Sequence, residues 1–126
     1  MRSLDRLSVY KTYVKFADGS GEKLRPIVIL VDDSDNFSSD RTALAIYSSK
    51  ERFNNERTRD FYAKILYEIK DPGVAGLNKN LTSYVNVAEE RLYPFRELME
   101  EAEFLGELSA RDSFGVMIKY NEYYSS

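Results

Sequence analysis

The sequence contains neither cysteine nor histidine. Without cysteine the chain has no disulfide framework and no thiolate zinc site, which fits a reducing compartment. Without histidine it lacks the commonest general base and the commonest metal ligand, so Ser-His-Asp hydrolysis and most zinc or iron chemistry are excluded. Any catalysis must therefore use carboxylates, amines, guanidinium groups, phenols or hydroxyls.

The sequence also lacks a long apolar run and a strong charge of either sign. The longest apolar run, residues 26–31, is far shorter than the roughly 20 residues that cross a bilayer, and the N-terminus has no apolar signal region. We therefore expect no membrane anchor and no export, with the cytoplasm as the default location. The formal net charge of −3 argues against a broad basic surface, so any nucleic-acid site has to be local.

The rest of the composition is that of an ordinary globular domain. The chain has 126 residues, of which 43% are hydrophobic and 31% charged. That length suffices for one core but makes a second domain improbable. We therefore expect a single domain over residues 1–126.

Hydrophobic periodicity predicts a mainly β fold. Residues 8–16 alternate with the period of a half-buried strand, and residues 26–31 and 42–47 form short apolar runs typical of buried strands. Residues 62–69 alternate again and predict a fourth strand. Two further short strands are expected at residues 83–87 and 91–95, which are rich in aromatic and branched side chains.

The segments between these strands are polar. Residues 17–24 predict a flexible loop and residues 32–40 a turn. Residues 50–60 fit either a short solvated helix or an exposed loop.

Helical spacing appears toward the end of the chain. Apolar residues within 95–102 recur at i, i+3, i+4 and i+7, which predicts one or two helical turns before Gly106. Ser109 and Asp112 have a spacing like that of a capping box, ahead of a C-terminal helix. Gly115 lies inside that helix at a cost of about 1 kcal/mol relative to alanine, so tertiary packing must hold the helix in place. Five to seven short strands and a terminal helix predict a small, strongly bent sheet or barrel that the helix closes on one side.

Three stretches of the sequence, taken in order, resemble the MazF/PemK toxin family. The first joins Val-Lys-Phe at residues 14–16, through a glycine-containing loop, to Leu-Arg-Pro-Ile-Val-Ile at 24–29, where the family has an arginine-proline pair at the start of its second strand. The second is Ala-Ile-Tyr-Ser-Ser at 45–49, similar to the place where the family carries a threonine-serine pair. The third combines Leu-Asn-Lys and Ser-Tyr-Val within 77–85 with Phe-Leu-Gly-Glu-Leu-Ser and an aspartate within 104–112.

This resemblance implies a fold, an activity and partners. The fold would be an SH3-like β-barrel with short helices and a C-terminal α-helix, usually assembled as a homodimer. The activity would be that of a toxin-type endoribonuclease, which cleaves single-stranded RNA by attack of the ribose 2′-hydroxyl on the adjacent phosphate and needs no metal or other cofactor. A cognate antitoxin protein would bind across or beside the active groove and compete with RNA.

The catalytic candidates are an arginine, a serine and a glutamate. Arg25 suits charge stabilisation, because a planar guanidinium offers paired donors to phosphate oxygens and stays charged. Ser48 stands where the family carries threonine and could orient the phosphate, while Glu22 could accept a proton if it points inward. Each also has a plainer interpretation: Arg25 as a surface arginine paired with a carboxylate, Ser48 as a turn residue, and Glu22 as a solvated loop charge.

Neighbouring residues are expected to contact RNA. Tyr47 adjoins the proposed site and could stack on an unpaired base. The other expected RNA contacts are Ser49 and the loop residues Gly19, Ser20, Gly21 and Lys23. The basic residues Lys50, Arg52, Arg57 and Arg59 could form a phosphate-binding edge, although the carboxylates interleaved with them favour a solvated face.

Two non-catalytic interpretations stay open. In one, a barrel of the same shape only docks a partner peptide in its groove, which the serine at position 48 favours. In the other, the domain binds single-stranded RNA without cutting it. Cleavage that depends on Arg25 would separate the enzyme from both.

Overall fold

The computed structural model describes residues 6–15, 19–30, 40–48 and 59–125. These residues form six strands, which join one antiparallel sheet in the order β4-β5-β3-β2-β1-β6. The strands are β1 (Ser8–Lys15), β2 (Glu22–Ile29), β3 (Asp40–Tyr47), β4 (Leu66–Glu68), β5 (Tyr84–Pro94) and β6 (Glu103–Glu107). The helices are α1 (Arg59–Ile65), α2 (Phe95–Glu101) and α3 (Ala110–Ser125). The expectation of five to seven strands with a terminal helix is confirmed.

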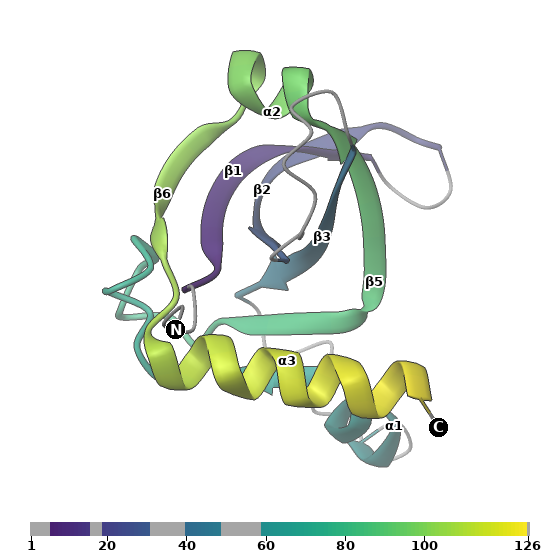
Figure 1. The fold of residues 1–126 in the computed structure, drawn as a ribbon, viewed down its shortest axis with the longest axis vertical. Coiled ribbons are helices and arrows are strands. Elements are labelled where there is room, and N and C mark those ends of the chain that lie inside the picture. The colour runs from purple at the N-terminus through teal and green to yellow at the C-terminus, as the bar shows by residue number, and fades with distance from the viewer. Residues whose placement is uncertain (1–5, 16–18, 31–39, 49–58, 126) are drawn as a thin grey trace, which may run out of the picture.

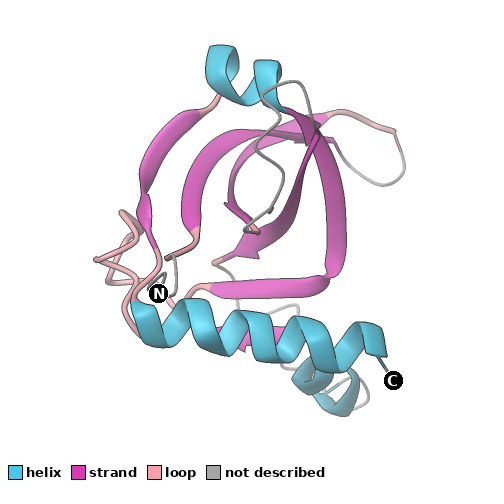
Figure 2. Ribbon diagram, in the orientation of Figure 1, coloured by secondary structure: helices cyan, strands magenta, loops and turns pink. Residues whose placement is uncertain are grey.

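The sheet is strongly curved, and its edge strands are β4 and β6. Figure 1 shows the strands bending around a common axis, with α2 at one end and α3 lying across the other, where it packs against β5. Figure 2 shows the helices at the outside of this curved sheet, with α1 close to the second half of α3. None of the helices in the described residues is long and apolar enough to cross a bilayer.

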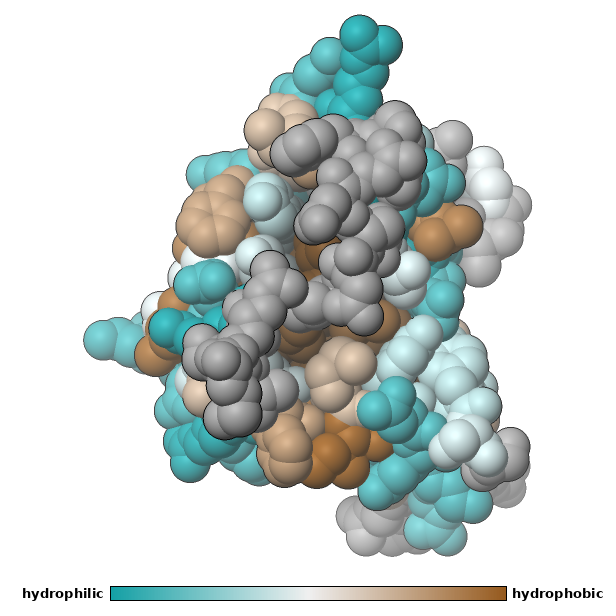
Figure 3. All heavy atoms as spheres, in the orientation of Figure 1, coloured by the Kyte–Doolittle hydropathy of each residue, from teal (hydrophilic) through white to brown (hydrophobic). Residues whose placement is uncertain are grey.

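Both faces of the sheet are buried over part of their area, because successive side chains of a strand point to opposite faces. On β2, Val28 joins a large apolar cluster that also contains Ile65 of α1 and Val116 of α3. The preceding Ile27 joins a smaller cluster with Leu98 of α2. In Figure 3, apolar side chains also reach the surface over α3. The two clusters fix the register of β2, since a shift by one residue would exchange its two faces.

The strand predicted for residues 62–69 is wrong for residues 62–65, which are helical, and confirmed only for residues 66–68, which form β4. Tyr62, Ile65 and Leu66 recur at i, i+3 and i+4, the spacing of one helix face, and all three pack in or against the large apolar cluster. The helix α1 therefore continues to Ile65, and only the three residues of β4 remain extended. A run this short satisfies both periodicities, so alternation alone could not decide between them.

Strands β5 and β6 also differ from expectation. The two strands expected at residues 83–87 and 91–95 are halves of one strand, β5. Its pairing with β3 skips residues 87–89, since Ala45 pairs with Asn86 while the preceding residue of β3 pairs with Glu90. Such a bulge bends a strand and interrupts its alternation, and Figure 1 shows β5 turning sharply. Strand β6 was not predicted, because an exposed edge strand lacks a regular apolar pattern.

Other segments follow the expectation more closely. The strands predicted within residues 8–16 and 42–47 are confirmed as β1 and β3. The second strand begins at Glu22, before its apolar run, because the polar residues pair with β1 as far as Lys15. The turn expected at 32–40 and the polar segment expected at 50–60 lie largely outside the described residues.

The C-terminal helix begins where the sequence predicts. The Ser109 hydroxyl accepts a hydrogen bond from the backbone N–H of Asp112 at 3.2 Å, as a helix N-cap does. The Asp112 carboxylate is fully buried and accepts hydrogen bonds from the backbone N–H groups of Lys70 and Asp71, each at 2.9 Å, and from the Tyr67 hydroxyl at 2.7 Å. Asp112 therefore joins α3 to the segment that follows β4.

Candidate functional site

An open cleft lies where β2 and β3 face the loop between β4 and β5. Its volume is about 220 Å³. It is lined by Lys11, Lys23, Leu24, Arg25, Pro26, Ile46, Ser48, Leu77, Asn78, Leu81 and Ser83. Three residues singled out from the sequence thus line one cleft: Lys23 and Arg25 of β2, and Ser48, which directly follows β3.

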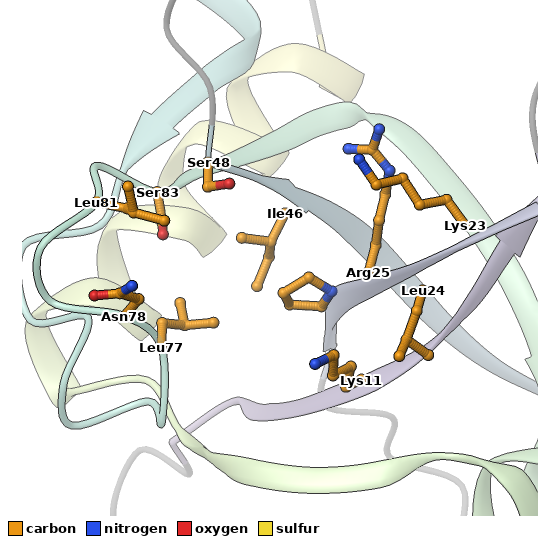
Figure 4. Close-up of a pocket in the computed structure, with 11 residues that line it drawn as sticks. Lys11, Lys23, Leu24, Arg25, Ile46, Ser48, Leu77, Asn78, Leu81 and Ser83 are labelled. Atoms are coloured by element: carbon orange, nitrogen blue, oxygen red, sulfur yellow. The ribbon is translucent and has the colours of Figure 1, made fainter.

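Strand alternation arranges the charged side chains of β2. Lys23 and Arg25 share one face of the strand, and Figure 4 shows both extending to the same side of β2, so that their cationic ends lie near each other. Leu24 and, from β1, Lys11 lie on the other side of the ribbon. Pro26 pairs with Lys11 across the two strands. The cleft is therefore lined by two adjacent cations on one side of β2 and by a third, Lys11, on the other side.

Arg25 lies over the ring of Tyr47, with its guanidinium carbon 4.7 Å from the ring centroid. Ile27 pairs with Ala45 in the antiparallel register of β2 and β3. Two residues further on, the same register places Arg25 opposite Tyr47, so the two side chains lie on the same face of the sheet. A guanidinium over an aromatic ring is held by the ring quadrupole and keeps its N–H donors free in its own plane. Arg25 is half-buried, which limits the directions that its side chain can take.

A carboxylate completes this arrangement. The Tyr47 hydroxyl donates a hydrogen bond to Glu89 Oε2, and the Asn86 side-chain amide donates to Glu89 Oε1 at 3.4 Å. The Asn86 side-chain oxygen in turn accepts a hydrogen bond of 2.9 Å from the backbone N–H of Ala88. The bulge in β5 explains why Glu89 reaches Tyr47, because residues in a bulge leave the regular alternation and are aimed in a new direction.

The opposite wall of the cleft comes from the loop between β4 and β5. This loop is held against β6 by Gly76, which has a φ of +75°, and a Cβ there would lie 2.1 Å from the Leu105 carbonyl oxygen. The backbone N–H of Leu77 donates a hydrogen bond of 2.9 Å to the Pro72 carbonyl oxygen, which closes the turn at the start of the loop. Only glycine combines that backbone conformation with so close an approach. Gly76 therefore holds the loop close against β6.

Glu22 lies in a different cleft. That second cleft, about 210 Å³ in volume, is lined by Tyr13, Glu22, Arg91, Leu92, Tyr93 and Glu97. Glu22 is exposed, and the structure does not bring it together with Ser48. Its part in proton transfer stays a prediction. Burial raises the pKa of Tyr93, the most enclosed side chain of the second cleft.

The remaining candidates are placed less centrally. Gly19, Ser20 and Gly21 are exposed in the turn before β2. Ser49 lies outside the described residues, as do Lys50, Arg52 and Arg57. Arg59 is the first residue of α1.

Sequence reasoning missed several side chains of the site. The polar lining includes Lys11, Asn78 and Ser83, and the Tyr47 partner is Glu89. Asn78 and Ser83 belong to the third stretch that carries the family resemblance, so that stretch was the available signal. No pattern in the sequence marked Glu89 as a site residue, because its contact with Tyr47 depends on a bulge in β5 that the sequence does not reveal.

The chemistry of the site involves cations, hydroxyls and one carboxylate. In the described ranges, no group of three or more Asp or Glu side chains is arranged to hold a metal ion. The arrangement suits an anion that is held by two adjacent cations while a phenol and a carboxylate exchange a proton beside it.

Neither the models of known protein families nor the curated proteins include a match to this sequence. Functional assignment therefore depends on the geometry of the cleft and on the motif resemblance.

Proposed function

We propose that this protein is a toxin-type endoribonuclease that cleaves single-stranded RNA by attack of a ribose 2′-hydroxyl on the adjacent phosphate, with no metal ion taking part. One observation carries the proposal. Arg25 is stacked over Tyr47, whose hydroxyl is bonded to Glu89, at the rim of a cleft that Lys23 and Ser48 also line.

Charge stabilisation is assigned to Arg25. The attack places additional negative charge on the phosphate oxygens, and preorganised cations that face this charge lower the barrier. The Tyr47 ring fixes the plane of the guanidinium before RNA arrives, so little entropy is lost when it binds the phosphate. Lys23, beside Arg25, is the second positive charge.

Proton transfer is assigned to Tyr47 and Glu89. As the Tyr47 oxygen accepts the proton of the 2′-hydroxyl, the phenol passes its own proton along the existing hydrogen bond to the Glu89 carboxylate. The bond from phosphorus to the 5′-oxygen breaks, and the Lys23 ammonium can supply a proton to that oxygen. The products are a 2′,3′-cyclic phosphate and a free 5′-hydroxyl. Ser48 lines the same cleft directly after β3, on the sheet face opposite Arg25 and Tyr47, so its part in orienting the phosphate rests on the motif resemblance alone.

The proposal extends to the finer fold and the partners. The strong curvature of the six-stranded sheet and the terminal helix alongside it support an SH3-like barrel of the MazF/PemK type. The resemblance to that family supports a homodimer and a cognate antitoxin that blocks the cleft. An antitoxin bound away from Arg25 without effect on RNA binding would contradict the last of these.

The test is cleavage of end-labelled single-stranded RNA in excess chelator, with identification of the fragment ends. We expect discrete cuts with cyclic-phosphate ends for the wild type. Arg25→Ala should lower the rate about 10²-fold to 10³-fold, the usual effect of removing one group that stabilises developing charge. Arg41→Ala is the matched control, because Arg41 lies over the Phe95 ring at 4.8 Å in the same kind of pair but does not line the cleft.

The two glutamates provide a second matched pair. Glu89→Gln should slow cleavage about 10²-fold or more, because the amide cannot take the proton. Glu22→Gln is the comparison variant, because the sequence-based candidate at Glu22 predicts the opposite result, a loss in Glu22→Gln and none in Glu89→Gln. Equal cleavage by the wild type and Arg25→Ala would contradict the proposal, and binding of RNA without any cleavage would favour the non-catalytic RNA-binding domain.

A further inference from the structure

The second cleft is built by four elements near the end of the sheet where α2 lies (Figure 1). None of its side chains takes part in the proposed cleavage of RNA. Its volume of about 210 Å³ is below the roughly 300–1,000 Å³ of sites for drug-sized ligands and leaves room for a molecule of amino-acid size. The lining residues are Tyr13 of β1, Glu22 of β2, Glu97 of α2, and Arg91, Leu92 and Tyr93 of β5.

A phenol without a partner lies at the bottom of the second cleft. Tyr93 is only 8% exposed, and among the described residues its hydroxyl has no hydrogen-bond partner. Every fully enclosed side-chain oxygen or nitrogen in the described ranges does have a partner, so this hydroxyl must reach open space. The open space that Tyr93 lines is the cleft. Because a phenol both donates and accepts, a ligand in the cleft can bond to it in place of water.

Opposite charges surround this hydroxyl without pairing. Burial raises the pKa of Tyr93, the Arg91 charge lowers it and the Glu97 charge raises it further, so both charges lie near the phenol. Glu22 is more exposed and lies toward the opening of the cleft. Within the part of the chain that the structure describes, none of these three charged side chains makes an ion pair. The gap between them can be bridged by a ligand that carries charges of both signs.

We infer that the second cleft binds a free basic α-amino acid, lysine or arginine. The cleft offers one guanidinium and two carboxylates, and such an amino acid carries one carboxylate and two cations, so each charge finds an opposite one. Arg91 binds the α-carboxylate through paired hydrogen bonds, Glu97 binds the α-ammonium group, and Glu22 binds the side-chain cation. The inference does not depend on the proposed function.

The apolar part of the opening suits the stem of a basic side chain. Tyr13 and Leu92 are both exposed and line the cleft together with Glu22. The methylene groups of lysine or arginine can lie along these side chains while the cation reaches the carboxylate or the Tyr13 ring. Simpler ligands match the cleft less well. A phosphate would meet two carboxylates, and an amine without a carboxylate would leave Arg91 without a partner.

The inference is tested by isothermal titration calorimetry of the whole protein with lysine, arginine and three analogues of lysine. Each analogue lacks one charge: cadaverine has no carboxylate, norleucine has no side-chain ammonium, and Nα-acetyl-lysine has no α-ammonium. We expect lysine and arginine to bind, and each analogue to bind at least about tenfold more weakly than lysine, because each loses one hydrogen-bonded charge pair.

Variants of the cleft assign each charge to its partner. Arg91→Ala should bind lysine and cadaverine equally, and Glu22→Gln should bind lysine and norleucine equally. Both comparisons are made within one variant, so a loss of folding cannot imitate them. Tyr93→Phe keeps the packed ring and should weaken lysine binding about threefold or more. Glu101→Gln is the control, because Glu101 is an exposed carboxylate of α2 that does not line the cleft, and it should bind lysine like the wild type.

Three results would overturn the inference. The first is the absence of binding to lysine and arginine at millimolar concentration by the folded wild type. The second is equal binding of cadaverine and lysine, which would mean that the cleft takes any cation. The third is equal binding of Nα-acetyl-lysine and lysine, which would point instead to a basic side chain of a polypeptide.

Discussion

At the scale of single residues, the structure explains a glycine that the sequence makes costly. Gly115 lies inside α3, where a Cβ would come within 2.3 Å of the Tyr67 ring. The same ring carries the hydroxyl that donates to the buried Asp112. Burial first, and then this hydrogen bond, raises the pKa of Tyr67 well above its ordinary value. The absence of a side chain at position 115 therefore lets Tyr67 lie across the helix.

We predict that Gly115→Ala destabilises the protein, although alanine is the better helix former. Helix propensity favours the change by about 1 kcal/mol, but forcing an atom against a packed ring typically costs about 1–3 kcal/mol, and both the ring and its hydrogen bond must move here. Urea unfolding measures the difference. Asn121→Ala, an exposed position of the same helix, should be neutral or stabilising. An increase in stability for Gly115→Ala would refute the packing explanation.

At the scale of elements, the loop between β4 and β5 is the part that shapes the cleft, and α3 holds it at its start. Arg111 of α3 makes two hydrogen bonds of 2.7 Å to the Asp71 carboxylate. The hydrogen bond from Arg111, aided by one from Ser109, lowers the pKa of Asp71 to about 2. The same loop then supplies Leu77 and Asn78 to the cleft.

This ion pair predicts a specific dependence on pH. Because the folded-state pKa of Asp71 is depressed, its contribution to stability is present above the unfolded value of 3.8 and is lost as the pH falls from there to about 2. Asp71→Asn should therefore lose stability less steeply than the wild type over that interval. Carboxyl NMR titration should place the Asp71 pKa near 2 in the wild type and closer to 3.8 in Arg111→Ala. A wild-type value near 3.8 would exclude the pairing in solution.

At the scale of the whole molecule, the charge is distributed unevenly. The chain carries a formal net charge of −3, yet the cleft gathers Lys11, Lys23 and Arg25. Under the proposed function, RNA would be attracted only through the few phosphates that touch the cleft, since the overall charge repels the polyanion. Affinity should then depend on local contacts more than on RNA length.

We predict a weak dependence of RNA binding on salt. With three phosphates neutralised, the logarithm of the binding constant should fall with a slope of roughly −2 against the logarithm of salt concentration. Titrations of an uncleavable oligonucleotide at several salt concentrations give this slope. Lys11→Ala should make it shallower by about 0.7. A wild-type slope several times steeper would mean that RNA contacts a much wider basic surface.

Local patterns in the sequence were sufficient for part of this structure. Alternation predicted β1, a short apolar run predicted β3, and the spacing of Ser109 and Asp112 predicted the start of α3. These features depend on residues that are close along the chain, so their physical causes can be recognised without knowing the fold.

Tertiary structure decided the rest. Packing against the apolar cluster made residues 59–65 helical, although alternation extended into them. The bulge in β5 brought Glu89 to Tyr47, and strand pairing left Glu22 in a separate cleft. Contacts between residues 42 positions apart depend on strand order and on register. The sequence by itself determined which residues could carry charge and hydroxyl chemistry, and only the curved sheet decided which of them meet, because that meeting is set by long-range pairing and burial.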